Sequence, residues 1–309
     1  MKVVVTGGAG FIGGNVCRHL AHRGHEAVVL DDLSTGFAAN AEGAGARLVE
    51  GSILDAAALD DVLDGAGAVI HLGARPSVPR SIADPMASHL VNATGTVEVL
   101  EAARRAGDVH VLVASSSSVY GSNPAMPKHE DLVPMPMSPY AASKLATESY
   151  ALAHGAAFGM PVLAFRFFNV FGPLQPAGHA YAAVVPAFVE AALAGKPLPV
   201  QGDGTQTRDF TFVATVAEVL VDAVERRVTS ERPVNLAFGS RVSLLELAAL
   251  LGEVLGRELE LDFGPRRVGD VPHTQADQTR LRSLFPDVEP VDLETGLRRT
   301  VAWFEALQS

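Results

Sequence analysis

Short apolar runs alternate with longer helical patterns through about the first 170 residues. Each run is almost continuously Val, Ile, Leu or Ala, which is typical of strands buried on both faces. Their alternation with helices predicts a parallel sheet covered on both sides, so we expect an α/β protein with a doubly wound sheet. The six predicted strands are residues 2–6, 26–30, 46–50, 68–72, 109–115 and 161–167.

The chain changes character after about residue 170. FGPLQPAGHAYAAVVP and GKPLPVQGDGTQTRDF are rich in Gly and Pro, and the helices between them are shorter, for example Leu244 to Leu255. Residues 210–226 again look like a strand followed by a helix, which suggests that the two parts interleave. We expect a first domain over 1–170, also taking in about 207–232, and a smaller C-terminal α/β domain over 171–309.

Charge and composition narrow the choice of partners. The 309 residues carry a formal charge of −11, and the basic residues are scattered, which argues against binding nucleic acid through its phosphates. The single Cys17 excludes an internal disulfide, and no apolar run reaches the roughly 18 residues of a membrane span. The start, MKVVVTGG, does not resemble a secretory signal. We expect a cytoplasmic protein with no membrane partner and no metal site.

The sequence VVVTGGAGFIGGNV predicts a buried strand, a glycine turn and the start of a helix. Gly8, Gly10 and Gly13 form a GxGxxG pattern, and Thr6, Gly7, Gly10 and Gly13 form TGxxGxxG. Glycine lets the backbone approach a pyrophosphate, whose charge then meets the amides and dipole of the helix N-terminus. Such turns are common, but the place of this one after the first strand predicts a dinucleotide site in a Rossmann-like fold.

The second predicted strand leads into Asp31 and Asp32. A carboxylate at the end of this strand accepts hydrogen bonds from the adenosine ribose hydroxyls and repels a 2′-phosphate, so NAD is favoured over NADP as the cofactor. The alternative interpretation is that Asp31 or Asp32 simply caps a turn.

The stretch SPYAASK sets a tyrosine and a lysine one helical turn apart. Ser138 can cap a helix whose first residue is Pro139, which places Tyr140 in the first turn and Lys144 on the same face. The helix N-terminus and the ammonium both favour a phenolate. Lowering the pKa of a tyrosine from about 10 to about 7 requires roughly 4 kcal/mol. A charge about 4 Å away supplies that order of energy at an effective dielectric near 20. The alternative is a solvated helix face.

Four serines, Ser115 to Ser118, follow the fifth predicted strand at the edge where doubly wound sheets bind ligands. A hydroxyl there can polarise a substrate oxygen while the phenolate moves its proton. The alternative is an ordinary turn, but the serines, the Tyr/Lys pair and the glycine turn together favour an active site.

These motifs resemble the extended short-chain dehydrogenase/reductases of the UDP-hexose 4-epimerase type over essentially the whole chain. The matching stretches are TGGAGFIG, HLGA (71–74), VPRSIADP (78–85), NATGT (92–96), SSSSVYG, SPYAASK, RFFNVFGP (166–173), QGDGTQTRDF and RVGD (267–270). The resemblance implies an NAD-dependent isomerase that interconverts UDP-glucose and UDP-galactose, with the N-acetylated pair UDP-GlcNAc and UDP-GalNAc as a further option. Alternatives are a UDP-glucuronate 4-epimerase and a non-catalytic NAD-binding sensor or scaffold.

The same resemblance implies the catalytic residues. Tyr140 is the expected acid and base, Lys144 its pKa partner and a nicotinamide ribose ligand, Ser116 the hydroxyl beside the sugar O4, and Ser118 a second hydroxyl. Dehydratases of the family commonly carry an Asp-Glu pair at the positions of Ser117 and Ser118, and decarboxylases carry a glutamate at the latter. Those acids are missing here, which argues against both reactions.

The implied NAD contacts come from the glycine turn, from the ends of the following strands and from the catalytic helix. They are Gly7, Gly10, Phe11, Ile12, Gly13, Asp31, Asp32, Ser34, Thr35, Gly36, Ser52, Ile53, Leu72, Gly73, Ala74, Asn92, Tyr140, Lys144 and Phe168. Two positions depart from the family pattern: Ser52 replaces a frequent aspartate near the adenine, and Pro76 replaces a lysine that some epimerases have. Either change could alter NAD retention.

The implied contacts to a UDP-sugar lie mostly in the C-terminal part. They are Ser116, Tyr140, Asn169, Val184, Gln201, Arg208, Arg267, Asp270 and Thr274. Arginine meets phosphate oxygens through two donors, although Arg208 could instead form a surface ion pair with Asp209. Thr274 stands where some epimerases have a bulky tyrosine against the sugar C2 group. The smaller residue leaves room for an N-acetyl group, unless it is an ordinary loop position.

Helices predicted near 86–106 and 138–158 carry small and apolar residues at regular spacing, including Ala141, Ala142, Leu145 and Ala146. Family members commonly dimerise through a four-helix bundle of these elements, so we expect a homodimer. The alternative is that these residues pack within one chain.

Overall fold

The computed structural model describes residues 1–176, 183–265 and 271–308. A seven-stranded sheet lies at its centre, and every neighbouring pair of strands in it is parallel. The strand order is β11 (Val234–Leu236), β6 (Val162–Phe167), β5 (His110–Ser116), β4 (Ala68–His71), β1 (Lys2–Thr6), β2 (Glu26–Asp31) and β3 (Arg47–Glu50). The sheet grows from β1 in both directions, so the predicted α/β, doubly wound fold is confirmed.

The six predicted strands all appear in this sheet, within a residue or so of their predicted bounds. The seventh strand, β11, was not predicted. It is only three residues long, and it pairs with β6 through Val234 opposite Phe165 and Leu236 opposite Phe167. A run this short shows no period by which a sequence pattern could reveal it.

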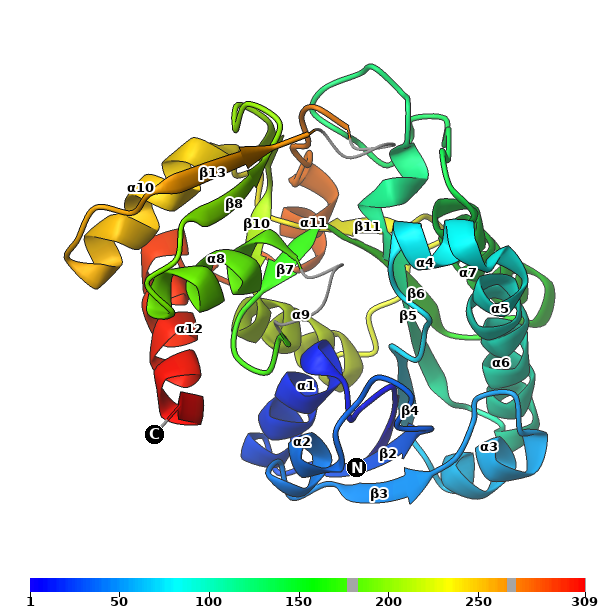
Figure 1. Cartoon of the computed structure of the whole chain (residues 1–309). Helices are drawn as coiled ribbons and strands as arrows, with labels where there is room; N and C mark the ends of the chain where they lie inside the picture. The colour runs from blue at the N-terminus through cyan, green and yellow to red at the C-terminus, as the bar shows by residue number, and fades with distance from the viewer. Residues whose placement is uncertain (177–182, 266–270, 309) are drawn as a thin grey trace.

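Helices cover both faces of the sheet (Figure 1). One face packs against α1 (Phe11–His22) and α9 (Val213–Glu225), and the other against α3 (Ala56–Leu63), α6 (Gly95–Ala106) and α7 (Pro139–Phe158). Successive residues of β1 alternate between the two layers, because Val3 and Val5 belong to one buried cluster and Val4 to the other. The chain returns from the C-terminal part to supply α9, which lies against α1.

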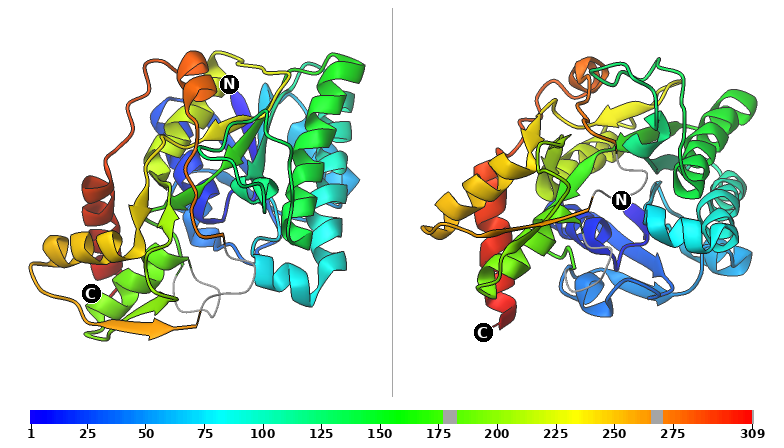
Figure 2. Two further views of the ribbon diagram at one scale, coloured as in Figure 1. Left: turned by 90° about the horizontal axis from the view of Figure 1, so that it is seen from above. Right: turned by 45° about the horizontal axis from the view of Figure 1, so that its top comes forward.

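Most elements of the C-terminal part form a smaller group beside the sheet (Figures 1 and 2). It contains the helices α8 (Val184–Leu193), α10 (Leu244–Leu255) and α12 (Leu293–Gln308), which share a separate apolar core that includes Phe188 and Leu247. Three two-stranded sheets accompany the helices. They pair β7 (Asn169–Phe171) with β10 (Phe210–Phe212), β8 (Leu198–Gln201) with β13 (Leu261–Gly264), and β9 (Thr207–Arg208) with β12 (Val242–Ser243).

Parallel strands bring their carboxyl ends to one edge of the sheet. Gly7 follows β1, Asp31 ends β2, Leu72 follows β4 and Ser116 ends β5, so four predicted site segments meet there. The strand that ends in Ser116 lies between β4 and β6, and β6 leads directly into the smaller group of elements. Within the described ranges, no helix has the length and hydropathy needed to cross a membrane.

Candidate active site

Helix α7 presents the predicted tyrosine and lysine to the end of β5. The Ser138 hydroxyl accepts a hydrogen bond from the Ala141 amide at 3.1 Å, and Pro139 is the first helical residue, so the predicted cap is confirmed. Lys144 is buried and its Nζ donates to the carbonyl of Ala114 at 2.8 Å. Because Tyr140 and Lys144 are one turn apart, this contact also turns Tyr140 toward β5.

The predicted hydroxyls form a short chain at this edge. Ser118 donates to the Ser116 hydroxyl oxygen twice, from its own hydroxyl at 2.9 Å and from its backbone amide at 3.1 Å. Ser116 in turn hydrogen-bonds the Tyr140 phenol. The two donors from Ser118 occupy the acceptor side of the Ser116 hydroxyl, which leaves its own proton for the phenol. The structure thus brings together three of the predicted catalytic residues, Ser116, Ser118 and Tyr140.

The electrostatics of the pair differ from the sequence-based expectation of a phenolate. Burial raises the pKa of Tyr140, and the Ser116 hydrogen bond only partly opposes that rise. Burial also lowers the pKa of Lys144 to about 8. The expected lowering of the Tyr140 pKa was therefore wrong in direction for the chain alone, because the Lys144 ammonium is engaged by the Ala114 carbonyl and both groups are desolvated.

The glycine turn has the shape that a dinucleotide needs. Gly7 has a φ of +71°, and a Cβ added to it would lie 2.7 Å from the Gly73 nitrogen; a Cβ on Gly13 would lie 2.3 Å from the Gly7 carbonyl oxygen. Gly10 is the N-cap of α1, and no side chain caps that helix. The amides of the first turn, beginning at Phe11, thus remain available to a pyrophosphate. The residues present fit NAD.

Asp31 lies beside this turn, but its carboxylate already has backbone partners. One oxygen accepts from the Ala9 amide at 3.0 Å and the other from the Leu33 amide at 2.9 Å. Burial raises the pKa of this carboxyl. Asp32 likewise accepts from the Ser34 amide at 3.0 Å. Both aspartates therefore brace turns, which was the alternative interpretation, although a carboxylate that accepts two bonds retains lone pairs for a ribose.

The other predicted cofactor residues line the same edge. Leu72, Gly73 and Ala74 follow β4, with the Gly73 amide donating to the Thr6 hydroxyl at 3.2 Å. Ser52 and Ile53 follow β3, Ser34, Thr35 and Gly36 follow β2, and Phe168 follows β6.

Asn92, predicted as a cofactor contact, makes hydrogen bonds within the chain that the sequence did not predict. It lies in a π-helical turn, Leu90–Thr94, and both of its amide protons are used, toward the Arg75 carbonyl at 3.2 Å and the Ser143 hydroxyl at 2.9 Å. Its side-chain oxygen accepts from the Arg75 amide at 2.7 Å. Asn92 therefore fastens the segment after β4 to helix α7.

Sequence reasoning missed a buried histidine beneath this edge. His71 ends β4, and its two ring nitrogens lie 2.7 Å from the Thr6 hydroxyl and 3.1 Å from the Thr96 hydroxyl. Burial, and to a lesser extent the charge of Lys144, lower its pKa to about 3, so it stays neutral. The position of His71 at the end of a predicted strand did not indicate that its side chain links Thr6 on β1 to Thr96 on α6.

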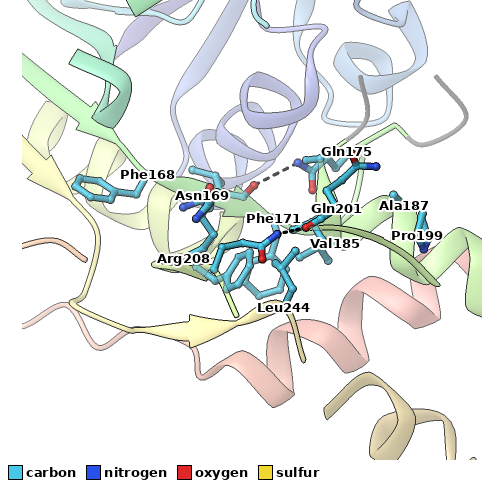
Figure 3. Close-up of a pocket in the computed structure, with 15 residues that line it drawn as sticks. Phe168, Asn169, Phe171, Gln175, Val185, Ala187, Pro199, Gln201, Arg208 and Leu244 are labelled. Carbon is cyan, nitrogen blue, oxygen red and sulfur yellow. Dashed lines mark hydrogen bonds between the residues drawn. The ribbon is translucent and has the colours of Figure 1, made fainter. Parts of the chain in front are cut away.

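A pocket of about 390 Å³ opens beside β7 and β9, in the part of the chain that follows β6 (Figure 3). Its volume lies within the size range of small-molecule sites. Four predicted substrate residues line it: Asn169, Val184, Gln201 and Arg208. Phe168, Phe171 and Phe210 form aromatic walls, and Gln175 and Gln206 add amides that were not predicted. Gln206 lies in QGDGTQTRDF, a stretch that matched the family, and Gln175 lies in the Gly- and Pro-rich stretch FGPLQPAGHAYAAVVP; these stretches were the signal that could have indicated the two glutamines.

Arg208 stands on β9 and is held by backbone carbonyls. Its guanidinium donates to the Thr207 carbonyl at 2.9 Å and to the Pro272 carbonyl at 3.3 Å. The alternative of a surface ion pair with Asp209 is wrong, because Asp209 is fully buried and accepts hydrogen bonds from Ala276, Gly239 and Ser240. Burial raises the pKa of the Asp209 carboxyl to about 6.

Thr274 is buried beside this strand, and its amide donates to the Thr207 carbonyl at 3.0 Å. It does not line the pocket. Arg267 and Asp270, predicted near the phosphate or ribose, lie outside the described residues. Within the described part of the chain, no group of three or more His, Cys, Asp or Glu side chains could hold a metal ion.

Comparison with known proteins identifies the family. A model described as the NAD dependent epimerase/dehydratase family matches residues 3–237. A UDP-glucose 4-epimerase of Mycolicibacterium smegmatis is 38% identical over 310 residues, which cover 98% of this chain and 98% of that protein. The chain belongs to the NAD-dependent epimerase/dehydratase family.

Solved structures agree over the full length. The UDP-glucose 4-epimerase of Thermotoga maritima, solved with UDP-glucose, has a TM-score of 0.94 and 32% identity, covering 100% of both chains. A UDP-N-acetylglucosamine 4-epimerase of Methanobrevibacter ruminantium has a TM-score of 0.93 and 33% identity, covering 99% of this chain and 98% of that one. The predicted family, NAD as cofactor and the enzyme class, an NAD-dependent UDP-sugar 4-epimerase and so an isomerase, are thereby confirmed.

Proposed function

We propose that the protein interconverts UDP-glucose and UDP-galactose by transient oxidation at the sugar C4. The observation that carries this proposal is the chain of hydroxyls from Ser118 through Ser116 to Tyr140. It ends a strand that lies between the glycine cradle, on β1 and β4, and the pocket reached through β6. A hydride acceptor on one side and a nucleotide sugar on the other would meet at these hydroxyls.

In the forward step, Tyr140 takes the proton of the C4 hydroxyl, and the Ser116 hydroxyl turns its single proton from the phenol to the same sugar oxygen. When bound, NAD supplies the acceptor that takes the C4 hydride and later returns it. Before the sugar binds, the Ser116 hydrogen bond favours the charged phenolate, because it is the one described contact that lowers the Tyr140 pKa. Lys144, fixed to the Ala114 carbonyl, contributes a positive charge one turn away.

In the return step, the 4-keto sugar turns within the site and presents its opposite face, and Tyr140 gives its proton back to O4. The pocket would hold the UDP during this turn, with Arg208 and Asn169 at the diphosphate and the aromatic walls around the uracil. Ser117 and Ser118 offer no carboxyl group for removing water or carbon dioxide, so the keto sugar is simply reduced again.

The roles of the predicted NAD residues belong to this proposal. The cradle of Gly7, Gly10 and Gly13 would hold the pyrophosphate and Asp31 the adenosine ribose. We also propose that residues 1–170, with about 207–232, form the NAD-binding domain and 171–309 the UDP-sugar-binding domain. The packing of α9 on α1 supports the interleaving, and the separate apolar core of α8, α10 and α12 supports the division.

The proposal extends to which UDP-sugars the protein accepts. Thr274 is small and buried next to the strand that carries Arg208, and the similarity to a UDP-N-acetylglucosamine 4-epimerase supports acceptance of N-acetylated sugars. We therefore infer that UDP-GlcNAc and UDP-GalNAc are a second substrate pair. UDP-glucuronate is the competing substrate, because it differs from UDP-glucose only at C6, where a carboxylate replaces the hydroxymethyl group.

The deciding experiment is to incubate the purified protein separately with UDP-galactose, UDP-N-acetylglucosamine and UDP-glucuronate, and to analyse the products. We expect UDP-glucose from the first and UDP-N-acetylgalactosamine from the second. Turnover of UDP-glucuronate alone would replace the proposed substrate. NAD binding without turnover of any of the three would instead support the sensor interpretation.

We further propose a cytoplasmic homodimer. The outer layer formed by α5 (Pro85–His89), α6 and α7 carries large exposed apolar side chains, among them Met86, Tyr150 and Phe158, which are 64%, 46% and 57% exposed. Ala141 and Leu145, which the sequence pattern assigned to this face, instead pack within the chain. Light scattering should give twice the 32.3 kDa chain mass; a monomeric mass would contradict the proposal.

A further inference from the structure

Glu148 and Arg166 form a buried ion pair one helical turn beyond Lys144. Glu148 is one turn after Lys144 on α7, and Arg166 is on β6; their side chains are only 4% and 3% exposed. Arg166 Nε donates to one carboxylate oxygen of Glu148 at 3.0 Å, and its terminal nitrogen donates to the other at 2.7 Å. This two-bond geometry fixes the guanidinium and the carboxylate in one plane.

The pair also reaches β5, the strand that ends in Ser116. Arg166 and Ser115 are opposite each other in the β5–β6 register. The Ser115 hydroxyl lies 2.7 Å from a Glu148 carboxylate oxygen and 3.1 Å from the Lys144 backbone carbonyl. Helix α7 is thus attached to β5 at successive turns, by Tyr140 to Ser116, by Lys144 to Ala114 and by Glu148 to Ser115.

Arg166 contacts the serine turn as well. Its guanidinium carbon lies 4.7 Å from the centre of the Tyr120 ring, and Tyr120 ends the 3₁₀ turn Ser117–Tyr120 that contains Ser118. The Tyr120 hydroxyl donates to Asn235 on β11 at 2.6 Å, which holds the ring in place. A single buried cation therefore contacts both elements whose side chains form the hydroxyl chain.

We propose that Arg166 is a positioning residue that sets the spacing between the Tyr140 phenol and the Ser116 and Ser118 hydroxyls. It acts on α7 through Glu148 and Ser115, and on the serine turn through Tyr120. This inference rests on the proposed function, since it assigns Arg166 a part in forming the site for proton transfer. Arg166 itself contacts neither the pocket lining nor the glycine turn among the described contacts.

The first test is Arg166→Lys, which keeps the charge but loses the second donor and the flat face against Tyr120. We expect kcat for UDP-galactose to fall roughly 10- to 100-fold, because small displacements of reacting groups are costly. We expect KM and the bound NAD content to stay within about twofold, because the binding surfaces are untouched. Arg105→Lys is the matched control: Arg105 also donates twice to a carboxylate, that of Asp60, but on the surface.

A second variant separates positioning from folding. Arg166→Met combined with Glu148→Met replaces the buried pair by apolar side chains, a change that often preserves stability. We expect normal thermal unfolding together with a kcat at least as low as that of Arg166→Lys. Ser115→Ala, which leaves the ion pair in place, should lower kcat by a smaller factor.

The outcomes distinguish the two proposals. Folded Arg166 variants with the kcat of the unaltered protein would overturn the positioning role and leave the proposed function standing. A loss of activity that only follows the fraction of folded protein would overturn it too. An unaltered protein that turns over none of the UDP-sugars would overturn the proposed function, and the positioning role with it.

Discussion

The two halves of the candidate site are built in different ways. At the end of β5, polar side chains hold one another: Ser118 to Ser116, Ser116 to Tyr140, and Ser115 to Glu148 and its arginine. In the pocket, aromatic walls surround a few polar groups, and Arg208 donates to the backbone carbonyls of Thr207 and Pro272. The hydroxyls at the end of β5 fix the positions of the reacting atoms. Side chains of the pocket can be replaced without moving those reacting atoms.

This difference teaches which changes should affect chemistry and which should affect recognition. A buried polar network loses function when any member shifts, because each group fixes the next. When a side chain in the pocket wall is replaced, only the binding energy of its own contact with the ligand changes. Substitutions in the catalytic half should therefore lower kcat, and substitutions in the pocket should change KM or substrate choice.

The largest effect is expected from Tyr140→Phe. Removing the phenol hydroxyl removes the group that we propose moves the O4 proton, so kcat should fall by roughly 10³-fold or more, within the range for a lost general acid or base. UDP binding, measured by calorimetry, should stay nearly unchanged because the pocket is intact. A Phe variant that keeps appreciable turnover would remove Tyr140 from its role.

Next comes the pH dependence of stability at Lys144. Burial lowers its pKa to about 8, below the 10.5 of a free lysine. Between these values the unfolded chain binds more protons, so this group makes the NAD-free protein more stable as pH rises from about 8 to 10.5. Lys144→Met should remove that rise, which amounts to at most about 3 kcal/mol. Urea unfolding of both proteins between about pH 8 and 10.5 measures this rise in the free energy of unfolding. Identical pH slopes for the two proteins would contradict the lowered pKa of the buried Lys144 side chain.

In the pocket, Arg208→Ala should act on binding. Losing charged hydrogen bonds to a diphosphate costs roughly 1.5 to 3 kcal/mol, about a 10- to 100-fold rise in KM, with a smaller change in kcat. Steady-state kinetics with UDP-galactose separates the two parameters. A fall in kcat at constant KM would place Arg208 in the catalytic half instead.

The smallest and most selective effect is expected from Thr274→Tyr. A larger side chain beside the Arg208 strand should reduce turnover of UDP-N-acetylglucosamine by roughly tenfold while UDP-galactose is converted as before. The ratio of kcat/KM for the two sugars is the measurement. An unchanged ratio would show that position 274 does not limit the space at the sugar C2 group.

Local signals in the sequence predicted the parts of the fold that depend on neighbours along the chain. The apolar runs gave six of the seven strands, and Ser138 and Pro139 marked the start of α7 correctly. Helix α10 was predicted with its observed bounds, Leu244–Leu255, and in the structure the Ser243 side chain caps it.

The remaining features depend on partners far apart in the sequence. No local pattern shows that the Lys144 ammonium reaches the Ala114 carbonyl, which is one reason the direction of the Tyr140 pKa was wrong. The contact between Arg166 and Glu148 joins a strand to a helix, and the two backbone partners of Asp31 come from a separate turn and its own loop. These contacts exist only once the strands have been placed side by side.

The central claim is that C4 loses and regains its own hydrogen while the Tyr140 phenol moves only the O4 proton. The most direct test starts from UDP-galactose that carries deuterium on C4, with unlabelled water, and examines the product by mass spectrometry and NMR. The account predicts UDP-glucose with the deuterium still on C4. Product with hydrogen from water at C4, or no product at all, would contradict it.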